Sequence, residues 1–167
     1  MEKKFLITAI DWSGSKKDSK NIYTLVSVEE KNYKKLKSYL ERNLSTKHWK
    51  KLSKREKTIY NTKFLRKWEE LKKYIYRSDI AFNIEDLIVK NYLILKNSKI
   101  LVVDNSIIKY FPKEVTKIII PENDTKIKKH YRPIILLSDN ISNIFRKLYN
   151  ETSNKKKRYE LLKRFRK

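Results

Sequence analysis

Residues 5–28, which decide the fold, read FLITAIDWSGSKKDSKNIYTLVSV. Two runs rich in β-branched and aromatic residues, 5–10 and 22–28, flank a polar bend, and this pattern predicts a buried β-hairpin. Asp11 closes the first run, where a carboxylate costs free energy unless it is paired or binds a cation. Asp11 therefore either caps an ordinary turn or belongs to a functional site. Gly14, the only glycine of the chain, predicts a turn with positive φ or a close backbone approach.

The composition indicates a single domain that binds a polyanion. A chain of 167 residues is long enough for one domain with a sizeable core. Lysine and arginine outnumber aspartate and glutamate by 42 to 19, which gives a formal net charge of +23. Nucleic acid, either DNA or RNA, is the expected partner, because basic side chains that neutralise phosphates release counterions.

The sequence also predicts in which cellular compartment the protein is found. No apolar run approaches the roughly 18 residues of a membrane span, so we expect no membrane partner. The chain has no cysteine, which excludes disulfides and cysteine-ligated zinc and fits a reducing compartment. We therefore expect a cytoplasmic protein.

Residues 29–77 are predicted to form a basic helical insertion after the second strand. Apolar side chains recur at helical spacing around Leu36 and again around Phe64. Two helices are therefore expected, joined by the segment 44–53. Lysine-rich helix faces are often only solvated, but here we interpret the aromatic stripes as core and the basic stripes as a surface for nucleic acid.

The second half of the chain alternates predicted strands and helices. Strands are expected at 78–83, 99–104 and 115–120, helices at 85–97 and 134–149, and a basic loop at 122–133. Asp104 repeats the pattern of Asp11, because it closes a nearly unbroken apolar strand. If these two strands are adjacent and parallel, both carboxylates emerge at one edge of the sheet, where they repel each other unless a divalent cation lies between them.

Two more acids are expected to lie in the first turns of helices. Glu85 begins the helix that Asn83 can cap, and Asp139 lies near the start of the last core helix, off its apolar stripe. Such acids often only complement the helix dipole. Alternatively, Asp139 and the polar row aligned with it face the edge of the sheet.

The predicted domain covers residues 1–150 and is followed by a basic tail or helix at 151–167. The segment 155–167 carries eight basic residues and one acid. This charge is suited to phosphate and carries no information about nucleotide sequence.

The order of these elements resembles the ribonuclease H-like fold, an α/β architecture with a mixed five-stranded sheet flanked by helices. Short motifs resemble more narrowly an uncharacterised ribonuclease H-like family called domain of unknown function 3800. Residues 11–14, followed by the strand 23–26, resemble the Asp-Glu-Ser-Gly opening of that family. Residues 135–139 resemble its Leu-Gln-Leu-Ala-Asp motif, and residues 46–49 resemble a degenerate form of its Glu-x-Lys-Trp motif. Trp12 and Thr46 stand where that family has acids.

The resemblance implies a nuclease in which carboxylates hold two Mg²⁺ or Mn²⁺ ions about 4 Å apart. The implied metal ligands are Asp11, Glu85, Asp104 and Asp139, with Asp86, Glu122 and Asp124 as substitutes for Glu85. Asp11 would bridge the ions, and His130 would carry a proton or help the product to leave. The basic residues expected to bind the nucleic-acid backbone are Lys47, Lys50, Lys51, Lys54, Arg55, Lys128, Lys129, Arg132, Arg146, Lys155, Lys156, Lys157 and Arg158.

Two alternatives remain at the level of sequence. The acids replaced by Trp12 and Thr46 allow a nucleic-acid-binding protein whose active site has decayed, and the high charge also allows a component of a ribonucleoprotein. Other hydrolase classes are disfavoured, because the sequence has neither a Ser-His-acid array nor a phosphate-binding glycine loop.

Overall fold

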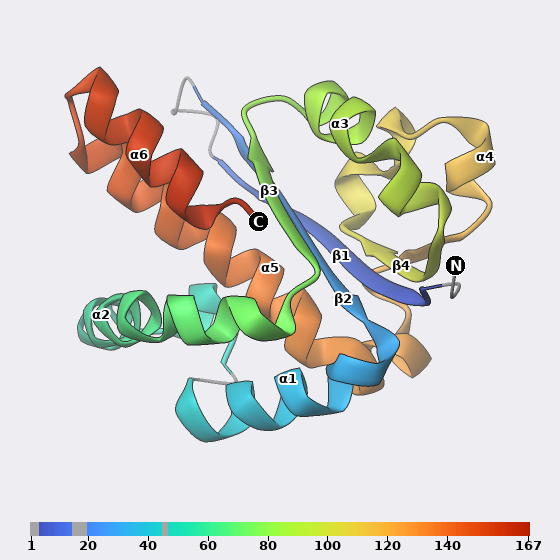
Figure 1. Ribbon diagram of the computed structural model, residues 1–167, viewed down its shortest axis with the longest axis horizontal. Helices are drawn as coiled ribbons and strands as arrows, with labels where there is room; N and C mark the ends of the chain where they lie inside the picture. The colour runs from blue at the N-terminus through green and yellow to red at the C-terminus, as the bar shows by residue number, and fades with distance from the viewer. Residues whose placement is uncertain (1–3, 15–19, 45–46) are drawn as a thin grey trace.

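The computed structural model describes residues 4–14, 20–44 and 47–167. A five-stranded mixed sheet of order β3-β2-β1-β4-β5 lies at its centre, with helices on both faces (Figure 1). The strands are β1 Leu6–Ser13, β2 Ile22–Glu29, β3 Arg77–Ala81, β4 Ser98–Val103 and β5 Ile119–Pro121. The pairs β1/β2 and β2/β3 are antiparallel, whereas β1/β4 and β4/β5 are parallel. The predicted α/β class and mixed five-stranded sheet are confirmed.

The strands β1 and β2 read as continuous apolar runs because both of their faces are covered. Ile7 and Ala9 of β1 pack in the core on one side of the sheet, and Ile10 packs in the core on the other. In β2, Val26 packs on the same side as Ile7 and Ala9, and Leu25 packs on the same side as Ile10. Alternate residues of a strand point to opposite faces, so a strand with two covered faces needs apolar residues at nearly every position.

Gly14 follows β1 at a close approach. A Cβ atom added there would lie 2.1 Å from Asn21 Oδ1 and 3.2 Å from the ring of Trp12. No described glycine has a positive φ, so the close approach, and not a left-handed turn, explains this glycine.

One face of the sheet carries the larger helical layer. It contains α1 Glu30–Asn43, α2 Lys54–Leu71, α5 Thr125–Glu151 and α6 Lys155–Phe165, with the short 3₁₀ segments η1 Trp49–Lys51 and η2 Lys72–Tyr74. The two stripes predicted around Leu36 and Phe64 are buried. α2 begins with a capping box, in which Ser53 accepts from the backbone N–H of Glu56 and the Glu56 side chain accepts from the backbone N–H of Ser53.

The other face carries α3 Ile84–Lys96, η3 Asn105–Tyr110 and α4 Lys113–Thr116 (Figure 1). The predicted cap of α3 is confirmed, because Asn83 Oδ1 accepts a hydrogen bond of 2.7 Å from the backbone N–H of Asp86. Within the described residues, no helix is both long and apolar enough to cross a membrane.

Two predicted elements differ from the observed ones. The strand expected at 115–120 is only Ile119–Pro121, because α4 takes up the first residues and buries Val115. The basic loop expected at 122–133 is largely helical, since α5 begins at Thr125 and contains Pro133. A proline usually ends a helix, but here the apolar stripe beyond it packs on the sheet and the helix continues. Asp139 therefore lies in the middle of α5 and not in a first turn.

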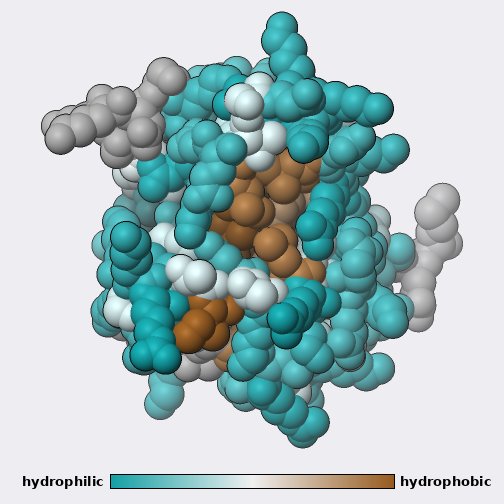
Figure 2. Space-filling model, turned by 90° about the vertical axis from the view of Figure 1, so that its left-hand side faces the viewer, coloured by the Kyte–Doolittle hydropathy of each residue, from teal (hydrophilic) through white to brown (hydrophobic). Residues whose placement is uncertain are grey.

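The basic C-terminal segment is an ordered part of the core. Phe165 of α6 is fully buried, and its ring stacks on Phe64 at 6.3 Å between centroids. Beyond α6, Lys167 exchanges backbone hydrogen bonds with Ser78, which covers the outer edge of β3. Figure 2 shows the side of the molecule that carries α2 and α6, where apolar side chains lie in a hollow surrounded by hydrophilic ones.

Candidate metal centre

Three carboxylates meet where the parallel strands β1, β4 and β5 end. Asp11 lies near the end of β1, and Asp104 and Glu122 directly follow β4 and β5. The backbone N–H of Asp104 donates to Ile10 O at 3.1 Å, and that of Glu122 donates to Val103 O at 3.0 Å, so the parallel pairing extends to both acids. One oxygen from each of the three carboxylates lies within 4.8 Å of the others. Asp11 and Asp104 thus lie as close together as parallel pairing predicts.

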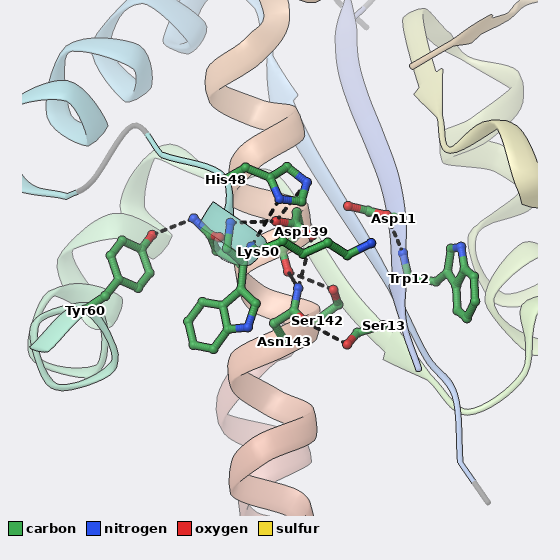
Figure 3. Close-up of polar contacts among 11 residues, drawn as sticks. Asp11, Trp12, Ser13, His48, Lys50, Tyr60, Asp139, Ser142 and Asn143 are labelled. Carbon is green, nitrogen blue, oxygen red and sulfur yellow. Dashed lines mark hydrogen bonds and ion pairs between the residues drawn. The ribbon is translucent and has the colours of Figure 1, made fainter. Parts of the chain in front are cut away.

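Asp139 reaches the same cavity from α5 and is held by several donors (Figure 3). Its Oδ2 atom accepts from the backbone N–H of Trp49 at 3.3 Å and lies 3.4 Å from His48 Nε2. Its Oδ1 atom accepts from Asn143 Nδ2 at 3.0 Å, one helical turn further along α5. Asn143 in turn accepts from Ser13 Oγ at 2.8 Å, which ties α5 to β1.

The environment disfavours the ionised form of Asp11 and of Asp139. Burial raises the pKa of Asp11 well above its usual value, and the negative charges of Asp139, Glu122 and Asp104 raise it further. Burial also raises the pKa of Asp139, although the His48 charge and the Trp49 N–H act in the opposite direction. Neighbouring carboxylates can all ionise at neutral pH when a cation neutralises them.

Three basic side chains line the same cavity as the carboxylates, and the volume of this cavity is about 510 Å³. Lys50 comes from η1, Lys57 from α2 and Arg146 from α5. Figure 3 shows the Lys50 side chain extending from η1 toward Asp11. An acidic centre beside three basic side chains suits a ligand that is itself an anion and is held in part through a cation.

The donor set fits Mg²⁺ or Mn²⁺. Every ligand atom that Asp11, Asp104 and Glu122 offer is a carboxylate oxygen, the donor that these hard cations prefer. Two oxygens on opposite sides of one Mg²⁺ are about 4.2 Å apart, given bonds of about 2.1 Å. The three carboxylate oxygens lie within 4.8 Å of one another, so at most a small side-chain adjustment is needed for them to surround one ion.

The fourth predicted ligand, Glu85, does not line this cavity. It is exposed in the first turn of α3, where it accompanies the Asn83 cap. Glu122, which the sequence offered only as a substitute, lies in its place beside Asp11 and Asp104. The signal for Glu122 was its position just past the β-branched run 118–120, from which Pro121 separates it. This pattern is close to the one that singled out the two aspartates.

The predicted histidine also lies elsewhere. His130 lies in α5 and not in a loop, and its ring packs at 4.7 Å from Tyr131 and 6.2 Å from Tyr33. Tyr33 further donates its hydroxyl to the carbonyl oxygen of His130 at 2.9 Å. The histidine of the cavity is His48, which sequence reasoning missed as a site residue, although it lies within the degenerate motif at 46–49. The position of Thr46 in that motif lies outside the described residues.

The predicted nucleic-acid-binding residues are spread over several surfaces. Among those that the structure describes, Lys50 and Arg146 line the cavity. The others lie around η1 and the start of α2 (Lys47, Lys51, Lys54, Arg55), on the first half of α5 (Lys129, Arg132) and at the start of α6 (Lys155, Lys156, Lys157, Arg158). Lys47 is paired with Glu56 at 3.0 Å. The side chain of Lys128 lies outside the described part of the structure.

No protein-family model matches the sequence, and no curated protein matches it either.

Proposed function

We propose that this protein is a metal-dependent nuclease that hydrolyses phosphodiester bonds of DNA or RNA on a ribonuclease H-like fold. The proposal rests above all on the meeting of Asp11, Asp104 and Glu122, whose carboxylate oxygens lie within 4.8 Å of one another. Asp139 lines the same cavity. Acids at the ends of neighbouring parallel strands and on the last long core helix agree with the arrangement that the sequence resemblance implies.

The order of the elements adds support for the fold. The first strand is central, the antiparallel strands β2 and β3 lie on one side of it, and the parallel strands β4 and β5 lie on the other. In the order of the chain, α1, η1 and α2 lie between β2 and β3, where the basic helical insertion is proposed, and His48 and Lys50 from the segment between α1 and α2 line the cavity. In this proposal the insertion thus supplies one wall of the active site.

Different residues of the chain would bind the metal ions, bind the phosphate and position the ligands. Asp11, Asp104, Glu122 and Asp139 would hold one or two Mg²⁺ or Mn²⁺ ions. When bound, such ions stabilise negative charge on the phosphate and lower the pKa of the water molecule that they hold. Lys50, Lys57 and Arg146 would bind phosphate oxygens and orient the backbone. His48 and the N–H of Trp49 would keep Asp139 ionised and in place.

A cleavage assay tests this function. Wild type and Asp104→Asn would be incubated with labelled single-stranded DNA, double-stranded DNA, RNA and an RNA-DNA hybrid, with Mg²⁺, Mn²⁺ or chelator. We expect metal-dependent cleavage that falls roughly a hundredfold or more in Asp104→Asn, since even residues behind metal ligands commonly contribute ten- to a hundredfold. Glu85→Gln is the matched control and should cleave like wild type, because Glu85 lies away from the cavity.

The opposite outcome favours a different function. If neither protein cleaves any substrate with any metal, and both bind nucleic acid equally in a strongly salt-dependent way, the nuclease proposal fails. The protein would then be a nucleic-acid-binding protein on the same scaffold. The acid that Trp12 replaces in the resembled motif is the observation that favours this second candidate.

A further inference from the structure

Trp12 lines the carboxylate cavity from the other side of β1. Neighbouring residues of a strand point to opposite faces, so Asp11 faces α5 while Trp12 faces the layer of α3. Figure 3 shows the two side chains on opposite sides of β1. A ligand that contacts both must therefore pass over the end of the strand, from the acidic side to the aromatic side.

The indole ring of Trp12 is held in a fixed orientation. Its Nε1–H donates to Ser106 Oγ at 2.9 Å, and Ser106 donates both its hydroxyl and its backbone N–H to Asp104 Oδ1. The ring also stacks on Tyr23, its direct neighbour on β2, with 6.3 Å between centroids and 23° between planes. The aromatic surface and the carboxylate centre are thus parts of one hydrogen-bonded unit.

Trp12 is also the tryptophan that the fold buries least. Trp49 is 8% exposed and Trp68 is fully buried, whereas Trp12 is partly exposed beside the cavity. A preoriented indole that remains accessible next to phosphate-binding groups is the arrangement by which proteins stack nucleic-acid bases.

We propose that Trp12 stacks an unpaired base, so that the substrate is a single-stranded nucleic acid. This inference rests on the proposed nuclease function for the identity of the ligand as nucleic acid. The phosphate of one nucleotide lies among the carboxylates, Lys50, Lys57 and Arg146, and the base next to it lies on the indole. Inside a duplex both faces of a base are covered by its neighbours, so an internal base of a duplex cannot make this contact, whereas a base of a single strand can.

Tryptophan fluorescence tests the stacking without any turnover. Wild-type protein would be titrated with short oligothymidylate, and separately with a relaxed closed circular DNA duplex, which has no ends, at equal nucleotide concentration. Both titrations would be made in Ca²⁺, which accepts the same oxygen ligands as Mg²⁺. We expect the single strand to quench the emission and the duplex not to do so. Trp12→Phe should lose most of the quenching, because Trp68 is fully buried and Trp49, which also lines the cavity, is only 8% exposed. Equal quenching by both nucleic acids, or quenching that is undiminished in Trp12→Phe, overturns the proposal.

Binding affinities provide the second readout. Trp12→Ala should weaken binding of the single strand roughly tenfold or more, the effect expected for one stacked base, and Trp12→Phe should retain most of the affinity. Tyr76→Ala, which removes a partly exposed ring at the opposite end of the sheet, should bind like wild type. If single strands quench the emission of Trp12 in Ca²⁺ but no substrate is cleaved in Mg²⁺ or Mn²⁺, the nuclease function is overturned and this inference is kept. Metal-dependent cleavage of duplex and single strand at equal rates, without quenching, would do the reverse.

Discussion

The Nε2 atom of His48 lies 3.4 Å from the Oδ2 atom of Asp139. This contact joins the connection between α1 and α2 to the middle of α5, and the backbone N–H of Trp49 donates to the same oxygen at 3.3 Å. A positive charge on His48 lowers the pKa of Asp139, while burial, the larger effect, raises it. His48 therefore helps Asp139 to remain an anion in a buried position.

Replacing His48 with alanine should change the pH dependence of activity. Without the opposing charge, the pKa of Asp139 rises further, and a carboxyl group with a raised pKa stays protonated to higher pH. The acidic limb of the pH profile for kcat/KM should therefore move to higher pH, with a loss of roughly ten- to a hundredfold on that limb. His130→Ala is the control, because that ring packs on Tyr131 and Tyr33. An equal shift in both variants would show that the His48 contact is not the cause.

Asp11→Asn should make the protein more stable and less active. The unfolded chain ionises this group near 3.8, whereas burial and neighbouring charges raise its pKa well above that in the folded protein. At pH values between the pKa of the unfolded chain and that of the folded protein, the folded state holds a proton on Asp11 that the unfolded chain has lost. The free energy of unfolding therefore falls as the pH rises through this window. The neutral amide removes this loss and should add roughly 0.5–2 kcal/mol at neutral pH.

The stability of Asp11→Asn is measured by urea unfolding at several pH values in the presence of chelator. The difference from wild type should vanish toward low pH, where the carboxyl is protonated in both states. Glu160→Gln, which changes an exposed acid on α6, should leave the curve unchanged. A variant that is less stable than wild type at neutral pH would contradict the expected role of Asp11.

Divalent cations should stabilise the protein through Glu122 and not through Glu85. An ion that binds only the folded state adds about 1.4 kcal/mol when its concentration is tenfold above the Kd. We expect Mg²⁺ or Mn²⁺ to raise the Tm of wild type and of Glu85→Gln equally, and to raise that of Glu122→Gln much less. Thermal unfolding with and without the cation measures this. The converse pattern, with Glu85→Gln insensitive to the cation, would place the ion elsewhere.

The last helix should be needed for folding. Phe165 is fully buried, stacks on Phe64 and packs at a tilt against Trp68, so Phe165→Ala should lower the free energy of unfolding by roughly 3–5 kcal/mol. Tyr159→Ala, on the same helix but 67% exposed, should change it by less than about 0.5 kcal/mol. Urea unfolding compares the two. If both variants were equally stable, α6 would be a surface appendage and not part of the core.

The sequence alone determined the sheet and two of its acids. The runs at 5–10, 22–28 and 99–104 are so rich in β-branched residues that strands were the evident interpretation, and β1, β2 and β4 lie there. Asp11 and Asp104 stood out because an acid at the end of a buried run is costly. The order of the elements further favoured an α/β class, which the structure has.

Apart from Asp139, which the family resemblance implied, tertiary structure decided which other side chains join these acids. A sequence pattern reports whether a residue is locally buried, but convergence depends on strand direction, strand order and the rotation of each helix. Pairing of β4 with β5 places Glu122 beside Asp104, while Glu85 points to solvent from α3. Packing of α5 on the sheet keeps it helical through Pro133, so His130 lies among tyrosines. His48 reaches Asp139 because α1 and α2 fold back over α5, a contact between distant segments that no local pattern encodes.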